Sequence, residues 1–213
     1  MPDSQADLAS LLCSRLCHDM LSPVGAMSNG LELLIEEQDE EMRARCMELL
    51  QQSAKISTDK LKFYRLAFGA AGGFGDEVPV TEAHGVIAAL VSNNERISLD
   101  WQVASESLPK PAIKVLLNLA LFAYDALIRG GTLQIAAERS SETSEIVVRA
   151  TGTKIAFNEE IGRAMEGATL AEGLSPKTAP AAMIHALASE MGGTLQYAIT
   201  EDALVLGAVI PVG

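Results

Sequence analysis

The chain has 213 residues, of which 48% are hydrophobic, 21% charged and 4% aromatic. This apolar content is enough for a packed core and excludes intrinsic disorder, which requires low hydrophobicity. The chain carries 16 basic and 28 acidic residues, so its formal net charge is −12. Phosphate backbones and anionic lipids repel so acidic a chain, which argues against nucleic acids and membrane surfaces as partners.

The sequence shows no sign of membrane insertion or secretion. No apolar run approaches the roughly 20 residues of a membrane span, and residues 1–5 lack the basic start of a signal peptide. The three cysteines, Cys13, Cys17 and Cys46, are an odd number and indicate no disulfide framework. Cys13 and Cys17 stand near His18, but no fourth metal ligand is apparent, which favours packing roles. We expect a soluble, cytoplasmic protein with reduced thiols.

The first third of the chain has the period of an α-helix. Apolar residues recur at steps of three and four over residues 8–35 and again over 41–68, with an acidic turn at 36–40 between them. Two long helices with a short connection form an antiparallel hairpin. Their apolar stripes exceed what two helices bury against each other, so we expect a homodimer whose two hairpins form a four-helix bundle.

After a glycine-rich segment at 69–75, helices and strands alternate. The pattern predicts an α+β fold whose sheet is covered by helices on one face. We expect three domain segments: a hairpin over 1–69, a linker over 70–79 and an α/β sandwich over 80–213. The predicted helices span 82–93, 109–128 and 180–191, and the predicted strands span 97–103, 132–137, 145–150, 194–199 and 203–210.

His18 lies on the polar side of the first predicted helix. It stands between Leu16 and Met20, so at about 100° per residue it points away from the apolar stripe. Its neighbours one turn away, Ser14 and Ser22, are small, and another protein can approach such a face closely. A histidine in this setting is also compatible with an ordinary surface residue, and so is Arg15 with an ordinary solvated charge.

The run Leu16-Cys17-His18-Asp19-Met20-Leu21-Ser22-Pro23 resembles the H-box of histidine kinase dimerisation domains. The resemblance implies that His18 accepts a phosphoryl group and that Asp19 orients or polarises its ring. A neutral imidazole is a good nucleophile toward phosphorus near neutral pH. Arg15 would then offset the phosphoryl charge, and the surface that a partner contacts would comprise Ser14, Arg15, Leu21, Ser22 and Gly25.

Residues 80–213 resemble the GHKL-type ATP-binding domain of histidine kinases in the order of their elements, but three of its motifs are altered. Phe122 stands where active kinases carry a magnesium-binding asparagine. Ala150 replaces the aspartate that binds adenine, and Lys154 replaces a glycine of the same motif. Residues 174–180 replace the last glycine-rich box, although residues 191–195 still match the family. These losses predict that the domain binds no ATP and that autophosphorylation fails.

An H-box hairpin beside a degenerate ATP-binding domain is similar to the ChpT family of histidine phosphotransferases, over about residues 8–212. The resemblance implies an intermediate in a bacterial phosphorelay connected with cell cycle regulation. It would take a phosphoryl group from the receiver domain of a hybrid histidine kinase (CckA-like). It would pass that group to the receiver domains of response regulators (CtrA-like and CpdR-like). The receiver would bring the magnesium, so we expect no cofactor or metal of the protein's own.

Two other functions are compatible with the same residues. A divergent histidine kinase would still bind ATP through contacts that the motifs do not show. A dimeric adaptor would bind receiver domains without phosphoryl exchange, with His18 as a relic. The other two histidines, His84 and His185, stand in no motif, and we expect a structural role for His185 and a core position for Trp101.

Overall fold

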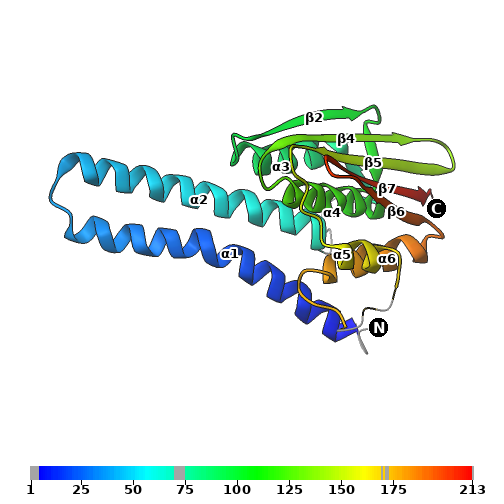
Figure 1. Cartoon of the computed structure of the whole chain (residues 1–213), viewed down its shortest axis with the longest axis horizontal. Coiled ribbons are helices and arrows are strands. Elements are labelled where there is room, and N and C mark those ends of the chain that lie inside the picture. The colour runs from blue at the N-terminus through cyan, green and yellow to red at the C-terminus, as the bar shows by residue number, and fades with distance from the viewer. Residues whose placement is uncertain (1–4, 70–74, 169, 171–172, 213) are drawn as a thin grey trace.

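A computed structural model describes residues 5–69, 75–168, 170 and 173–212. The chain begins with helix α1 (Gln5–Glu36), which a short connection joins to helix α2 (Glu40–Phe68). Asp39 caps α2 by accepting a hydrogen bond from the backbone N–H of Met42 at 2.9 Å. The two helices form the predicted antiparallel hairpin, and its connecting end projects away from the rest of the molecule (Figure 1).

The second part of the chain is built around a five-stranded sheet with the order β2-β4-β5-β7-β6. Its β2–β4 pair is parallel and the other three pairs are antiparallel. The strands are β2 (Ile97–Val103), β4 (Gly131–Arg139), β5 (Thr143–Thr151), β6 (Thr194–Ile199) and β7 (Ala203–Pro211). A separate two-stranded ribbon pairs β1 (Glu77–Pro79) with β3 (Ser107–Pro109).

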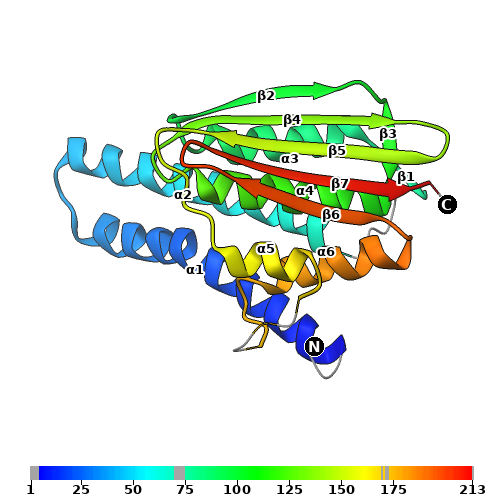
Figure 2. The same cartoon turned by 45° about the vertical axis from the view of Figure 1, so that its right-hand side comes forward.

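Helices cover one face of the sheet, as the sequence predicts (Figure 2). They are α3 (Val80–Ser92), α4 (Lys110–Ala126), α5 (Glu159–Met165) and α6 (Ala179–Glu190). Strand β5 shows why the sheet has one apolar face: Ile146, Val148 and Ala150 are buried, whereas Val147 between them is 47% exposed. This alternation follows from the period of two along a strand.

Helix α4 is the centre of the core, because it packs against the sheet, against α3 and α6, and against α2 of the hairpin. Phe63, Tyr64 and Ala67 of α2 are at most 4% exposed and belong to the same apolar cluster as α4 and the sheet. The second half of α2 therefore packs both within the hairpin and against the α/β part. Towards its N-terminus α1 diverges from α2 and runs beside α6 (Figures 1 and 2).

The predicted elements are present with small shifts of their ends, and strands 97–103 and 194–199 have the predicted bounds. Three short elements were missed, namely β1, β3 and α5. Strand β1 lies inside the segment 70–79 that we expected to be a linker, and the first half of that segment, 70–74, lies outside the described residues. Across the described helices, none is long and apolar enough to cross a membrane.

Candidate functional site

His18 lies on α1 with 82% of its side chain exposed, as expected for a residue opposite the apolar stripe. Its Nδ1 atom is 3.1 Å from Oδ1 of Asp19. An ionised carboxylate can only accept, so this contact requires the proton on Nδ1. The Nε2 atom then carries the free lone pair and points away from Asp19. In the neutral ring, this contact favours the tautomer whose outer nitrogen has the free lone pair.

Asp19 is the most heavily bonded group at the site, with a side chain that is 15% exposed. Its Oδ2 atom accepts hydrogen bonds from Nε of Arg15 at 2.6 Å and from the hydroxyl of Tyr64 at 2.5 Å. Burial by itself would raise the pKa of Asp19, but the hydrogen bonds from Tyr64, His18 and Arg15 outweigh it and hold this pKa below its usual range. Asp19 therefore stays ionised beside His18.

The proline of the H-box explains a further contact of Asp19. Pro23 has no N–H, so the carbonyl of Asp19, four residues earlier, lacks its helical partner. The ammonium group of Lys60 on α2 donates to this carbonyl at 3.0 Å. A cation from the second helix thus satisfies the group that the proline leaves free, next to the histidine.

Arg15 lies between two carboxylates rather than in solvent, with 14% of its side chain exposed. While Nε contacts Asp19, Nη2 donates to Oδ2 of Asp125 on α4 at 2.9 Å. Burial would lower the pKa of Arg15, but the charges and hydrogen bonds of Asp125 and Asp19 raise it above its usual range. Arg15 therefore connects the histidine helix to the α/β part of the chain.

His18 stands at the edge of a cleft of about 550 Å³ between α1 and the α/β part. The α1 side of this cleft contains Ser14, Arg15, His18 and Asp19, and the opposite side contains Phe122, Asp125, Phe157, Asn158, Ile161 and Lys177. Leu21, which is 70% exposed, and Ser22 continue the surface of α1 outside the cleft. A Cβ added at Gly25 would meet nothing within 4 Å, so this surface is open. Ser14, Leu21, Ser22 and Gly25 therefore share one accessible side of α1, whereas Arg15, which was also expected there, is held by Asp19 and Asp125.

The altered nucleotide motifs occupy the other side of the same region. Phe122 is 3% exposed and Ala150 is completely buried. Asn118 donates to the carbonyl of Lys114 at 2.8 Å, and its buried Oδ1 has no partner. A triphosphate in the cleft would meet the aromatic ring of Phe122 and the carboxylate of Asp125. Phe122 offers no ligand for magnesium, and the carboxylate of Asp125 is already paired with Arg15.

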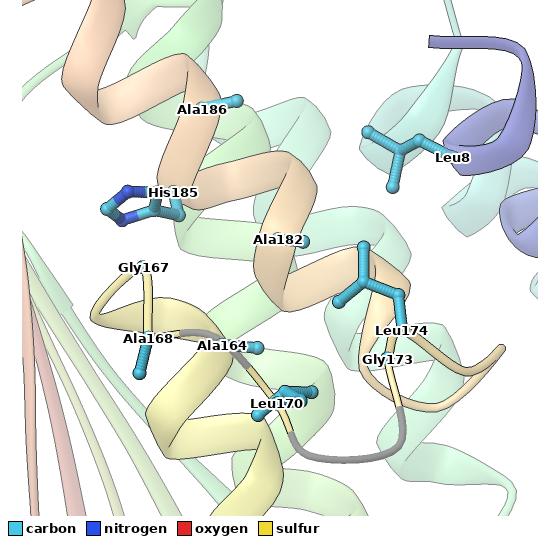
Figure 3. A pocket seen from close by; sticks show the side chains of 10 residues that line it. All are labelled: Leu8, Ala164, Gly167, Ala168, Leu170, Gly173, Leu174, Ala182, His185 and Ala186. Atoms are coloured by element: carbon cyan, nitrogen blue, oxygen red, sulfur yellow. The ribbon is translucent and has the colours of Figure 1, made fainter. Parts of the chain in front are cut away.

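The remaining histidines and cysteines lie apart from this chemistry. His185 lines a smaller cavity of about 210 Å³ between α5, α6 and the start of α1 (Figure 3). Its Nδ1 is 2.9 Å from the carbonyl oxygen of Met165, so its ring is held against the end of α5. Among the described residues, no three His, Cys, Asp or Glu side chains are grouped to hold a metal ion. Trp101 is half-buried against the core, with its ring 4.9 Å from that of His84.

Sequence reasoning missed three residues of the site: Tyr64, Lys60 and Asp125. Tyr64 was assigned to an apolar stripe, and its hydroxyl gave no signal of its own. Pro23 has no N–H and so leaves a helix carbonyl without its partner. This was a usable signal that a donor such as Lys60 lies nearby. Asp125 lies 110 positions from Arg15, so no local pattern connects the two.

Comparison with known proteins agrees with this geometry. Residues 80–203 match the family model described as the histidine phosphotransferase C-terminal domain. The chain is 35% identical over 205 residues to the protein phosphotransferase ChpT of Brucella abortus (strain 2308), covering 96% of each sequence. A bacterial phosphotransferase of known structure superposes with a TM-score of 0.84 at 33% identity, covering 96% of this chain and 97% of that one. The chain therefore belongs to the histidine phosphotransferase family.

Proposed function

We propose that Nε2 of His18 is the atom through which this histidine phosphotransferase exchanges phosphoryl groups with receiver domains of a phosphorelay. The single observation that carries the proposal is the contact between Nδ1 of His18 and Asp19, which leaves Nε2 unprotonated and exposed. The family assignment supports the same activity. It also favours transfer over the kinase and adaptor alternatives.

The proposed step is a reversible displacement at phosphorus. The Nε2 lone pair attacks the phosphorus of a receiver's aspartyl phosphate, a P–N bond forms, and the P–O bond to the aspartate breaks. The aspartate leaves as a carboxylate, and the imidazole ring becomes positively charged while its proton stays on Nδ1. Asp19 stabilises that charge, because its carboxylate accepts from Nδ1. Attack by the aspartate of a second receiver reverses the step.

The proposed docking surface consists of Ser14, Leu21, Ser22 and Gly25 around His18. Their small or apolar side chains allow close approach, whereas the net charge of −12 gives no long-range attraction to an acidic receiver pocket. The donor expected from the family resemblance is the receiver of a CckA-like hybrid kinase, and the acceptors are CtrA-like and CpdR-like regulators. The magnesium ion of the reaction belongs to the receiver's carboxylates.

We also propose that two chains pair through their hairpins. Val24, Leu31 and Ile35 of α1 are 47%, 54% and 79% exposed, and Met47 and Leu61 of α2 are 45% and 49% exposed. The intervals of seven and four along α1 place its three residues on one stripe. The exposed Cys17 lies seven residues before Val24 on that stripe. A second hairpin would bury this surface as a four-helix bundle and give the cysteine a packing role.

Finally, we propose that the protein holds no ATP and uses no cofactor of its own. Phe122 and Asp125 support this, because the first offers no magnesium ligand and the second is already paired with Arg15. The phosphoryl group then comes from a receiver.

A transfer assay tests the central proposal. The protein is incubated with a phosphorylated receiver domain and the labelled phosphoryl group is followed, with His18→Ala and the exposed-histidine control His84→Ala beside the wild type. Wild type and His84→Ala should both take up the label, and His18→Ala should not. Full uptake by His18→Ala would refute the assignment. Receiver binding without any transfer by the wild type would select the adaptor function instead.

A further inference from the structure

The ion pair between Arg15 and Asp125 joins the two parts of the chain beside His18. Nη2 of Arg15 on α1 lies 2.9 Å from Oδ2 of Asp125, near the end of α4. A chain of contacts then runs from Asp125 to Arg15, from Arg15 to Asp19 at 2.6 Å, and from Asp19 to Nδ1 of His18 at 3.1 Å. Three contacts thus connect Asp125, a residue of the α/β part, to His18, the proposed nucleophile.

We infer that Asp125 is a positioning residue for phosphoryl transfer, because it directs the guanidinium of Arg15 so that Asp19 keeps one oxygen for His18. This inference rests on the proposed role of His18. A guanidinium presents parallel N–H groups that match both oxygens of one carboxylate. In the structure Asp125 takes Nη2, so Arg15 gives Asp19 only its Nε, at Oδ2. The Oδ1 atom of Asp19 therefore remains available to Nδ1 of His18.

Without Asp125, nothing described in the structure holds Nη2 away from Asp19. Arg15 can then turn both parallel N–H groups toward Asp19, and the second of them would compete with Nδ1 of His18 for Oδ1. The contact that keeps the proton of His18 on Nδ1 would weaken, and the tautomer with hydrogen on Nε2 would increase. That tautomer has no lone pair on its outer nitrogen, so fewer molecules could attack phosphorus. The expected defect is therefore in the reaction step and not in receiver binding.

A second polar connection between the same two parts of the chain provides the control. Lys55 of α2 donates to Asn93, just after α3, at 3.2 Å, and Asn93 donates to Asp59 at 3.3 Å. Asn93→Ala removes both contacts of Asn93 and leaves only the longer one from Lys55 to Oγ of Ser92, at 3.4 Å. It removes no contact of Arg15 or Asp19. If the Asp125 contact only held the two parts together, Asn93→Ala and Asp125→Ala would behave alike.

The test compares Asp125→Ala, Asp125→Asn and Asn93→Ala in the full chain, with His18→Ala as the inactive reference. The transfer rate is measured over a range of phosphorylated-receiver concentrations, so that kcat and KM are separated. The tautomer of His18 is read from the ¹⁵N chemical shifts of its ring, assigned by the signal that His18→Ala lacks.

We expect Asp125→Ala to lower kcat on the order of tenfold, the effect of losing one charged hydrogen bond, with KM unchanged. Its ¹⁵N shifts should move toward the tautomer protonated on Nε2. Asp125→Asn, whose amide oxygen still accepts from Arg15, should recover most of both values, and Asn93→Ala should match the wild type.

Two results would overturn the inference by itself: wild-type kcat and ring shifts in Asp125→Ala, or an equal loss in Asn93→Ala. Transfer that survives His18→Ala would overturn the proposed function and this inference with it. The tautomer measurement separates the two cases, because it reports on the ring whether or not the ring is the phosphoryl acceptor.

Discussion

Replacing Tyr64 by phenylalanine removes one oxygen atom from the centre of the site and leaves the packing in place. The ring of Tyr64 is 4% exposed, meets Phe63 edge-on at 5.8 Å and stacks on Phe68 at 5.3 Å. Both ring contacts remain possible for phenylalanine. The change therefore isolates the hydrogen bond from the hydroxyl to Oδ2 of Asp19.

The magnitude follows from the charge of the acceptor. A hydrogen bond to an ionised group contributes about 1.5–3 kcal/mol, roughly twice a neutral one. Arg15 and His18 still contact Asp19 in the variant, so we expect a loss of about 2 kcal/mol in the free energy of unfolding at neutral pH. In a chain of this size that corresponds to a decrease in Tm of roughly 4–8 °C.

The pH dependence gives the sharper test. The folded-state pKa of Asp19 lies below its usual value, so ionised Asp19 contributes stability above about pH 4. That contribution is lost as the pH falls through the folded-state pKa. Since Tyr64→Phe removes one cause of the low pKa, the stability difference between wild type and variant should be complete at pH 6–8 and decrease below about pH 4.

The assay is urea denaturation at matched protein concentration from pH 8 down to about pH 2, so that it includes the range below the usual pKa of an aspartate. Tyr124→Phe is the control, because it removes another half-buried hydroxyl, one that bonds to Asn94 instead of Asp19. Equal stability of Tyr64→Phe and wild type at pH 7 would refute the reasoning. A difference that persists unchanged into acid would show that the hydroxyl acts by packing and not through the charge of Asp19.

Three further predictions concern other parts of the molecule. Leu31→Glu places a charge on the exposed stripe of α1, so light scattering should show a dimer for the wild type, as proposed, and a monomer for the variant. Gly162→Ala in α5 brings a Cβ to 2.4 Å from the ring of Tyr197, and thermal unfolding should show a loss of about 1–3 kcal/mol. Magnesium ATP should leave Tm unchanged, whereas a ligand at 100 times its Kd adds about 2.7 kcal/mol; an increase in Tm would favour the divergent kinase.

The fold was predictable wherever a period extends over enough residues. The long helices repeat their apolar positions over many turns, and β5 alternates from Ser144 to Ala150. Helix α5 has seven residues with Gly162 inside it, and β1 and β3 have three residues each, ending in Pro79 and Pro109. Such segments are too short for a helical or strand period to be recognised in the sequence. They form because the surrounding core and strand partners provide the contacts.

The site residues on α1 were predictable from the sequence, whereas their partners on α2 and α4 were not. His18 and Asp19 are neighbours in sequence, so the H-box indicates both. Tyr64 lies 45 positions from Asp19, and Asp125 lies 110 positions from Arg15. Those pairings depend on how α2 and α4 pack against α1, which a local pattern does not record. Arg15, expected at the phosphoryl group, is instead held by two carboxylates.

This packing gives the α/β part a structural role at the histidine that requires no nucleotide. The α/β part buries Phe63, Tyr64 and Ala67, and so fixes the side of α2 from which Tyr64 reaches Asp19. On α4, Phe122 closes the region where a magnesium ligand would stand, and Asp125, one turn later, pairs with Arg15. Helix α4 thus contributes to the setting of the histidine. Because these contacts join the α/β part to the hairpin beside His18, we expect the two parts to remain docked during transfer.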